Sequence, residues 1–498
     1  MTTDIASAPF LWVIPLAMFL GTFILVFRDK PAIPHQWMLL AQPMLTIVVI
    51  FGLSMIGNIG WMIASLAGTL AFFVATMVCH RELFERRPAS QHLTEFYLWM
   101  SFGGVLGGIF AALVSPQIFN AVWEYPLLLV LAMACRPGIG KRVSKTETLE
   151  LLAIAAGAIA VMLLIASLHR RGVLDMGNAD NLRALMLMGL GGLALLQRDA
   201  AARQLVFTAI AVLTLALLPS PMNRGDAERS FFGVHRVETR ADGTMRMLLH
   251  GTTLHGAERL VSKDGSPIIR PLPATYYHPN SPMKRGIDVA RANHTSAETF
   301  RVGIVGLGAG AMACNAREGE AWRFYEIDPV VVKIASDPKR FRFLSACQPN
   351  ADIVVGDARL TMAKEPDGRF DYLVIDAFSS DSVPVHLLTV EAVRLYLEKL
   401  TPNGLLAFHV SNRHLQLTTV AAAVANAIPG THAALVTDSR NGQDYDAVSS
   451  QVVLIARSKE ALGDVLTWPG ASVADPADVT PWTDDYSDIL SSIWRKYR

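Results

Sequence analysis

Eight apolar segments in the first 220 residues constrain the fold of this chain more than any other feature. A helix needs roughly 17–25 apolar residues to cross a bilayer, and inside a bilayer its backbone polar groups must pair within the segment. Only 25 charged side chains fall in residues 1–220, against 62 in residues 221–498. An α-helical polytopic membrane bundle is therefore predicted for residues 1–220. The segments lie near 10–27, 37–56, 60–79, 96–115, 118–135, 148–168, 183–197 and 204–219.

The pattern changes to strands after Arg229. Residues 230–250 are typical of a β-hairpin, with Asp242 and Gly243 in its turn. The proline-rich stretch 271–282 is expected to be a loop that carries Tyr276, Tyr277 and His278 toward the next domain. A small β-hairpin domain is predicted over residues 221–290.

Residues 302–328 combine a strand, a glycine turn and a second strand. The apolar run Val302–Val305 meets Gly306, Gly308 and Gly310, and the next apolar run ends in Glu326 and Asp328. Glycines let the backbone approach a ligand closely, and an acid at this spacing suits two ribose hydroxyls. The stretch therefore predicts a site for a nucleoside-containing cofactor.

Strands and helices alternate from this turn onward, which favours a Rossmann-like, doubly wound, methyltransferase-like sheet over residues 291–498. Strands are expected at 302–306, 323–327, 352–356, 371–376, 404–410, 433–437 and 451–456. Helices are expected at 310–317, 329–336, 388–400 and 415–427.

Acids follow three successive strands of this predicted sheet: Glu326, Asp357 and Asp376. Ligands of such sheets bind at the carboxyl ends of the strands. The glycine turn also satisfies the dinucleotide fingerprint, so NAD is an alternative. We favour an S-adenosyl cofactor, because Asp357 could accept the adenine amino group and Asp376 lies where a sulfonium would be.

Four motifs resemble the spermidine synthase (polyamine aminopropyltransferase) family: GLGAG at 306–310, YEIDP at 325–329, GDAR at 356–359 and DYLVIDAFSSD at 371–381. The whole architecture resembles the bacterial membrane-fused spermidine synthase-like proteins. The resemblance implies transfer of an aminopropyl group from decarboxylated S-adenosylmethionine to an amine, without a metal.

The resemblance also implies roles for individual residues. Glu326 would hold the ribose and Asp357 the adenine, with Gly306, Gly308 and Gly310 against the nucleoside. Asp328 and Ala358 would be further cofactor-binding residues. Asp376 would be the general base. The amine would contact Tyr277, His278 and Asp381.

The chain departs from the family pattern around the acceptor. Asp376 and Asp381 are five residues apart rather than three, no glutamate follows Tyr277-His278, and the hairpin motif HGTTLHG lacks a glutamine. These changes argue against putrescine more than against the cofactor. Asp484 and Asp485 are candidates for the missing negative charge.

Two other functions fit the same residues. One is an S-adenosylmethionine-dependent methyltransferase acting on a membrane-associated or small-molecule substrate, and the other is a non-catalytic, nucleoside-sensing membrane protein. The expected partners are an amine, the lipid bilayer and a second copy of the chain in a homodimer. The formal net charge of +1 predicts no attraction to nucleic acid.

The cysteines and the loop charges bear on the compartment. Cys79, Cys135, Cys314 and Cys347 show neither metal-ligand spacing nor a disulfide framework, so free, buried thiols are expected. The loops after the first, third, fifth and seventh segments carry most of the basic residues, which places these loops in the cytoplasm. Eight crossings would then leave the C-terminal domain outside. We favour seven crossings of a bacterial inner membrane and a cytoplasmic C-terminal domain, with the outward-facing domain as the alternative.

Overall fold

The computed structural model describes the chain except residues 1–8, 56–57, 140–143, 198–199, 221, 241, 252, 263, 378–383, 441–445 and 498. The described residues form two compact units, Pro9–Arg229 and Ser230–Arg498. The division lies nine residues beyond the boundary expected at 220. The hairpin region and the α/β region fall in the same unit.

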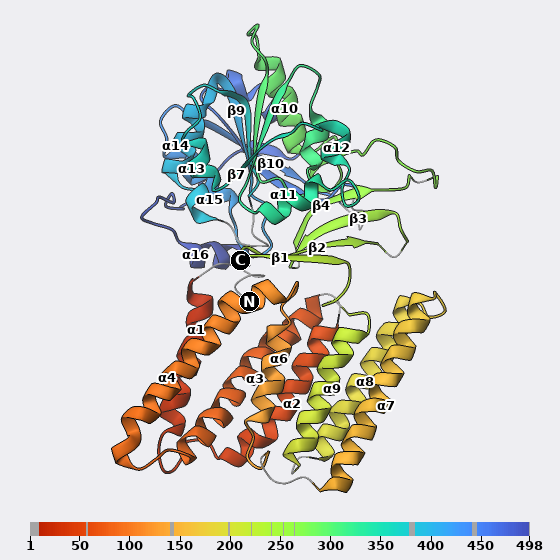
Figure 1. Ribbon diagram of the computed structural model, residues 1–498. Helices are drawn as coiled ribbons and strands as arrows, with labels where there is room; N and C mark the ends of the chain where they lie inside the picture. The colour runs from red at the N-terminus through yellow and green to blue at the C-terminus, as the bar shows by residue number, and fades with distance from the viewer. Residues whose placement is uncertain are drawn as a thin grey trace. The chain divides into compact units, whose positions relative to one another are not determined.

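The first unit consists of helices that lie side by side (Figure 1). Helices occupy most of each of the eight expected apolar segments. Five helices are long and apolar enough to cross a membrane, and three apolar helices are shorter. The seventh segment is longer than its sequence suggests, because its helix begins at Met176. The helices are α1 (Pro9–Val26), α2 (His35–Ser54), α3 (Asn58–Glu85), α4 (Leu93–Ile109) with its continuation η2 (Phe110–Val114) and α5 (Ser115–Ile118), α6 (Glu124–Ala134), α7 (Lys145–Arg170), α8 (Met176–Leu196) and α9 (Ala201–Leu217).

Many large apolar side chains of these helices are exposed, among them Ile24, Leu66, Leu98, Leu164 and Leu196. So many exposed large apolar side chains are rare on soluble proteins and suit contact with lipid. Polar side chains instead turn toward neighbouring helices: Arg136 donates to Gln42 Oε1 at 2.9 Å, and Gln42 Nε2 donates to the Ala132 carbonyl at 3.0 Å.

A small four-stranded sheet in the order β1-β2-β3-β4 follows the helices along the chain, and its strands β2, β3 and β4 belong to the second unit. The pairs β2–β3 and β3–β4 are antiparallel, and Asp242 Oδ1 accepts the Thr244 N–H at 3.0 Å in the expected turn. The strands are β1 (Asp226–Ser230), β2 (Gly233–Thr239), β3 (Met245–His250) and β4 (Thr253–Arg259).

A larger, mixed sheet of eight strands follows, in the order β12-β10-β11-β9-β8-β5-β6-β7. All seven expected strands are present, and β12 is additional. From β7 to β9 the neighbours are parallel, whereas β11 is antiparallel to β9. The chain order reverses between β5 and β8, which is where doubly wound sheets bind ligands. The strands are β5 (Arg301–Val305), β6 (Ala321–Glu326), β7 (Asp352–Val355), β8 (Phe370–Ile375), β9 (Leu400–His409), β10 (His432–Asp438), β11 (Ser450–Ala456) and β12 (Ala471–Val473).

Helices cover both faces of this sheet (Figure 1). Ile287 of α10 and Ile334 of α11 pack on one face, and Tyr396 of α14 and Val420 of α15 on the other. Strand β8 is buried along its whole length, as expected for a parallel strand covered on both sides. The helices are α10 (Pro282–Asn293), α11 (Pro329–Ser336), α12 (Phe343–Cys347), α13 (Ala358–Met362), α14 (Val390–Lys399), α15 (Thr418–Asn426) and α16 (Ile489–Lys496).

Two expectations about residues near the glycine turn are wrong. The segment expected as a helix at 310–317 is the short 3₁₀ helix η4 (Ala311–Asn315). Cys314 and Cys347 are not free thiols but form a disulfide with a Cα–Cα distance of 5.0 Å. The turn folds η4 against α12, since a Cβ on Gly310 would lie 3.1 Å from Leu344. The 33-residue separation in sequence gives no sign of this contact.

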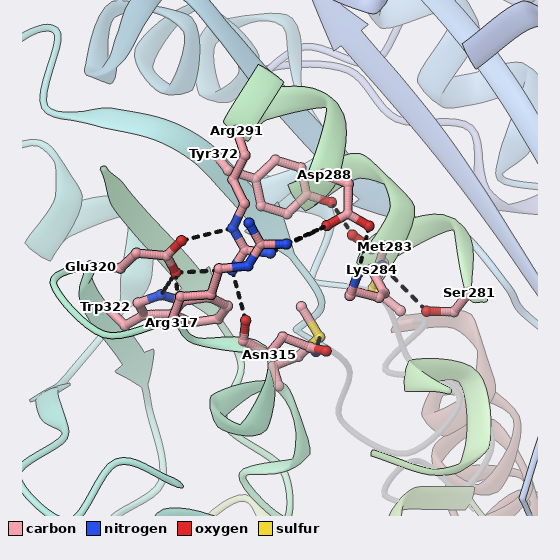
Figure 2. Close-up of polar contacts among 11 residues, drawn as sticks. Ser281, Met283, Lys284, Asp288, Arg291, Asn315, Arg317, Glu320, Trp322 and Tyr372 are labelled. Carbon is pink, nitrogen blue, oxygen red and sulfur yellow. Dashed lines mark hydrogen bonds and ion pairs between the residues drawn. The ribbon is translucent and has the colours of Figure 1, made fainter. Parts of the chain in front are cut away.

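A polar network ties α10 to the region after the glycine turn (Figure 2). Arg291 donates to Glu320 from Nε at 2.7 Å and from Nη2 at 2.9 Å, and its Nη2 also donates to the Asn315 carbonyl at 2.7 Å. Glu320 additionally accepts the Trp322 indole N–H and the Arg317 backbone N–H, both at 3.0 Å. Burial tends to raise the pKa of Glu320, but these hydrogen bonds outweigh it and hold the pKa below its usual 4.5.

Replacing Glu320 by Gln should therefore destabilise the protein by about 2 kcal/mol at neutral pH, because Arg291 loses a charged, two-point partner. Because the pKa of Glu320 is lower in the folded protein than in the unfolded chain, its carboxylate stabilises the fold at pH values above the unfolded-chain pKa. This stabilisation is lost as the pH falls through the pKa of the folded protein. Thermal unfolding of the full-length protein in detergent should show a difference that shrinks below about pH 4.5. Glu318→Gln, at an exposed neighbour, is the control; an equal effect there would contradict the prediction.

Candidate active site

The strand register brings three of the predicted acids to one edge of the large sheet. Val305 pairs with Tyr325 and with Ile375, and Glu326 pairs with Val355. Glu326 ends β6, Asp376 follows β8, and Asp357 lies two residues beyond β7. Because the strands run β7-β6-β5-β8, the edge reads Asp357, Glu326, Gly306, Asp376, in steps of about 4.8 Å between neighbouring strands.

The glycine turn lies directly against its neighbours. Gly306, Gly308 and Gly310 have φ values of +95°, +53° and +85°, which side chains rarely adopt. A Cβ on Gly306 would stand 2.2 Å from the Asp376 carbonyl oxygen, and one on Gly308 2.6 Å from that of His255. Glycine is required here by the protein's own packing as well as by any ligand.

Glu326 holds this turn in place. Its Oε2 accepts the Leu307 N–H at 2.9 Å and its Oε1 accepts the Asp328 N–H at 3.0 Å. Burial raises the pKa of Glu326, against the effect of these two backbone donors. Each carboxylate oxygen retains a lone pair that could accept a ribose hydroxyl.

Asp328 is engaged by the protein on both oxygens. Oδ1 caps α11 by accepting the Val330 N–H at 2.9 Å, while Oδ2 accepts from Ser230 Oγ at 2.5 Å and contacts His235 Nε2 at 2.7 Å. Its side chain is 2% exposed. Burial favours a higher pKa, but His235 and Ser230 prevail and lower the pKa of Asp328. Asp328 thus joins β2 to the start of α11.

Asp357 and Ala358 lie at the start of α13. Asp357 Oδ1 caps the helix by accepting the Leu360 N–H at 3.0 Å, and Oδ2 contacts His386 Nε2 at 3.1 Å. The Asp357 side chain is 25% exposed, which leaves it open to a ligand, whereas Ala358 packs in the core beside β6 and α14.

Asp376 is the centre of a buried cluster. Its Oδ2 accepts the Tyr277 hydroxyl, and its Oδ1 lies 2.6 Å from His409 Nδ1. Tyr276 stacks on the His409 ring with centroids 4.7 Å apart. Burial and the charge of Asp376 raise the pKa of Tyr276 and Tyr277 well above 10, so both remain protonated donors.

His409 is not among the site residues expected from the sequence, and its place beside Asp376 is the main feature that the sequence did not reveal. A signal existed, because β8 and β9 are parallel neighbours in which Ile375 pairs with Phe408. Asp376 follows Ile375 and His409 follows Phe408, so this register places the two side by side.

Tyr277 and His278 point to different partners. Tyr277 contacts Asp376, whereas His278 Nε2 lies 2.7 Å from Asp438 Oδ2 at the end of β10. Asp438 also pairs with Arg440 at 2.8 Å. Asp381 lies outside the described residues. Of the two C-terminal acids, Asp484 pairs with Arg359 at 2.6 Å.

A cavity of about 390 Å³ opens beside His409, between β4 and the ends of β9, β10 and β11. Its size suits a small organic molecule. In the part of the chain that the structure describes, no group of three His, Cys, Asp or Glu side chains could hold a metal ion. The cavity is lined by Thr253, Leu254, His255, Tyr276, His409, Ser411, Asn412, Arg413, Thr437, Asp438, Ser439, Val448, Ser449, Ser450 and Gln451.

A polyamine aminopropyltransferase of Vibrio vulnificus (strain CMCP6) is 30% identical to this chain over 111 residues, which are 21% of this chain and 36% of that protein. The chain resembles the spermidine synthases. It spans about a third of the length of this curated relative. No protein-family model matches the chain.

Solved structures of spermidine synthases are similar to about half of the chain. A probable spermidine synthase from Corynebacterium glutamicum ATCC 13032 covers 53% of this chain and 97% of its own, at 15% identity and a TM-score of 0.38. A spermidine synthase in complex with the transition state analogue AdoDATO covers 54% of this chain and 82% of its own, at 12% identity and a TM-score of 0.32.

Replacing Gly306 by Ala should destabilise the protein far more than Gly368→Ala. Both glycines have positive φ, but a Cβ on Gly368 would have no heavy atom within 4 Å, whereas one on Gly306 would overlap the Asp376 carbonyl. Gly368→Ala should cost about 1 kcal/mol from its backbone conformation alone, and Gly306→Ala at least about 3 kcal/mol. Denaturant unfolding of the two variants measures the difference, and equal losses would show that the turn can move away from Asp376.

Proposed function

We propose that the second unit is a spermidine synthase-like aminopropyltransferase, with decarboxylated S-adenosylmethionine as donor and an amine as acceptor. The order of side chains along the sheet edge carries this proposal. Asp357, Glu326, Gly306 and Asp376 follow one another as an adenine amino group, a ribose, a sulfonium-linked carbon and a reacting carbon would in an extended sulfonium nucleoside. Across three strand spacings this edge covers about 14 Å, the scale of such a molecule.

The Asp376 cluster suits the chemistry. The amine nitrogen attacks the carbon beside the sulfonium, the carbon–sulfur bond breaks toward sulfur, and the amine loses a proton to the cluster. The Asp376 carboxylate would favour the positive charge that develops on the amine. Alignment of nitrogen, carbon and sulfur would supply much of the remaining acceleration. The cavity beside His409 would admit the acceptor.

A methyltransferase is the second candidate. The parallel strands order as β7-β6-β5-β8-β9, and the acid ending β6 can hold a ribose whichever group is transferred. Intact S-adenosylmethionine carries a carboxylate that the decarboxylated donor lacks, and a sheet edge rich in acids should disfavour it.

The homodimer expected from the sequence stays a prediction.

Isothermal titration calorimetry should show the full-length protein binding decarboxylated S-adenosylmethionine at least tenfold more tightly than the intact form, and mass spectrometry should find an aminopropylated product in a mixture of amines. Asp376→Asn should lower turnover by a factor of about 10³ or more while the donor dissociation constant stays within about threefold. Asp478→Asn, an exposed aspartate after β12, is the matched control. Tighter binding of the intact donor with methylated product would establish the methyltransferase instead.

The side of the membrane is a separate proposal. Eight crossings, by the five long apolar helices together with the three shorter ones, would leave the second unit outside the cytoplasm, because the basic loops follow the odd-numbered segments. The Cys314–Cys347 disulfide also fits an oxidising compartment, since disulfides are rare in the cytosol. We therefore propose the outward-facing alternative in place of the cytoplasmic one. The donor would then have to reach that compartment.

A C-terminal alkaline phosphatase fusion should accordingly be active in cells, and the same fusion to β-galactosidase inactive. In non-reducing peptide maps of protein whose free thiols were blocked before lysis, Cys314 and Cys347 should appear as one linked pair. The control fuses each reporter after Ala89, in the loop following α3, which should give the opposite pattern. An active β-galactosidase at the C-terminus would restore the seven-crossing, cytoplasmic arrangement.

A further inference from the structure

We propose that His409, rather than Asp376, takes the proton from the acceptor, and that Asp376 is a positioning residue for it. This inference rests on the proposed transfer reaction, which needs a proton acceptor at this place. It assigns a base from the end of β9, in addition to the acid that the family motif supplies.

Asp376 is poorly placed to receive the proton directly. Its side chain is 2% exposed. One oxygen accepts the Tyr277 hydroxyl and the other faces His409 Nδ1 at 2.6 Å. Because the raised pKa of Tyr277 keeps that phenol protonated, both oxygens already have donors.

His409 has the complementary arrangement. With Asp376 at Nδ1, the proton of a neutral ring belongs on Nδ1, and Nε2 carries the lone pair. Nε2 lies 2.8 Å from Ser411 Oγ, and this Oγ accepts the Gln451 backbone N–H at 2.7 Å. The serine hydroxyl can therefore donate its own proton to Nε2. The connectivity is that of a base oriented by a carboxylate and facing a hydroxyl.

The cavity gives Nε2 a route to substrate. His409, Ser411 and Tyr276 all line it. Tyr276 fixes the ring plane by stacking on it. His255 lines the same cavity, and burial lowers its pKa to about 3, so it adds no positive charge beside His409. An acceptor entering from the cavity would take the place of the Ser411 hydroxyl at Nε2.

The proton balance is then complete. The neutral amine forms its new carbon–nitrogen bond as the carbon–sulfur bond breaks and the thioether leaves with the bonding pair. The secondary ammonium gives one proton to His409 Nε2. The resulting imidazolium keeps its own proton on Nδ1, from which it donates a hydrogen bond to the Asp376 carboxylate. The proton returns to solvent through the cavity before the next turnover.

The decisive variant is His409→Ala. Its turnover number should fall by about 10²–10⁴-fold, with the donor dissociation constant within twofold of the wild type. Added imidazole should restore at least tenfold of the lost rate, which a purely structural histidine would not allow. Retention of turnover within fivefold, or a loss that imidazole does not reverse, would overturn the assignment and leave Asp376 as the direct base.

His432→Gln is the matched control. His432 pairs with Ala456 at the start of β10, whereas the cavity residue Asp438 pairs with Ser450 at the other end of the strand. Its turnover should equal that of the wild type. Ser411→Ala should lose less than tenfold, because the acceptor itself replaces the hydroxyl.

A labelling experiment tests His409 independently of the transfer reaction. Diethyl pyrocarbonate acylates an unprotonated imidazole nitrogen, so mass spectrometry of the full-length protein should find His409 modified, together with the 50% exposed His386 as positive control. An unmodified His409 beside a fully modified His386 would overturn the proposal. A modified His409 in a protein that aminopropylates no amine would instead overturn the proposed function and keep the proton-accepting nitrogen.

Discussion

The buried carboxylate of Asp376 is the constraint on which the candidate site depends. An ionised carboxylate in a protein interior is costly unless it is paired and hydrogen-bonded. Tyr277 and His409 provide those partners from the loop before α10 and from β9. The partners of this one charge therefore connect the loop before α10, the end of β8 and the cavity wall at the end of β9.

The backbone carbonyl of the same residue explains why the turn needs glycine. Gly306 passes so close to the Asp376 backbone that no side chain fits between them. Glu326 holds this glycine turn by accepting the backbone N–H groups of Leu307 and Asp328. Strands β5, β6 and β8 thus present a narrow, rigid edge in which the positions of a nucleoside pocket are set by backbone contacts. Such preorganisation avoids reordering the site when a ligand binds.

Local sequence patterns were sufficient to predict the seven main strands and the acids at their ends. Short apolar runs that lead into Glu326, Asp357 or Asp376 carry both kinds of information in one stretch of chain. Contacts between distant segments could not be predicted. The Cys314–Cys347 disulfide depends on how η4 folds against α12, and the pairing of Asp328 with His235 joins residues 93 positions apart. The contact of His409 with Asp376 could not be predicted either, because it depends on the parallel pairing of β8 with β9.

Several acids at this edge serve the fold as well as any ligand. Asp328 caps α11 and Asp357 caps α13, so loss of either carboxylate would remove a helix cap worth about 1 kcal/mol in addition to any ligand contact. Asp376 caps no helix among the described residues, and its buried charge has Tyr277 and His409 as partners. An effect on activity at Asp376 or His409 can thus be separated from an effect on local folding by measuring donor binding. At Asp328 the two effects are inseparable, because both of its oxygens already bind the protein.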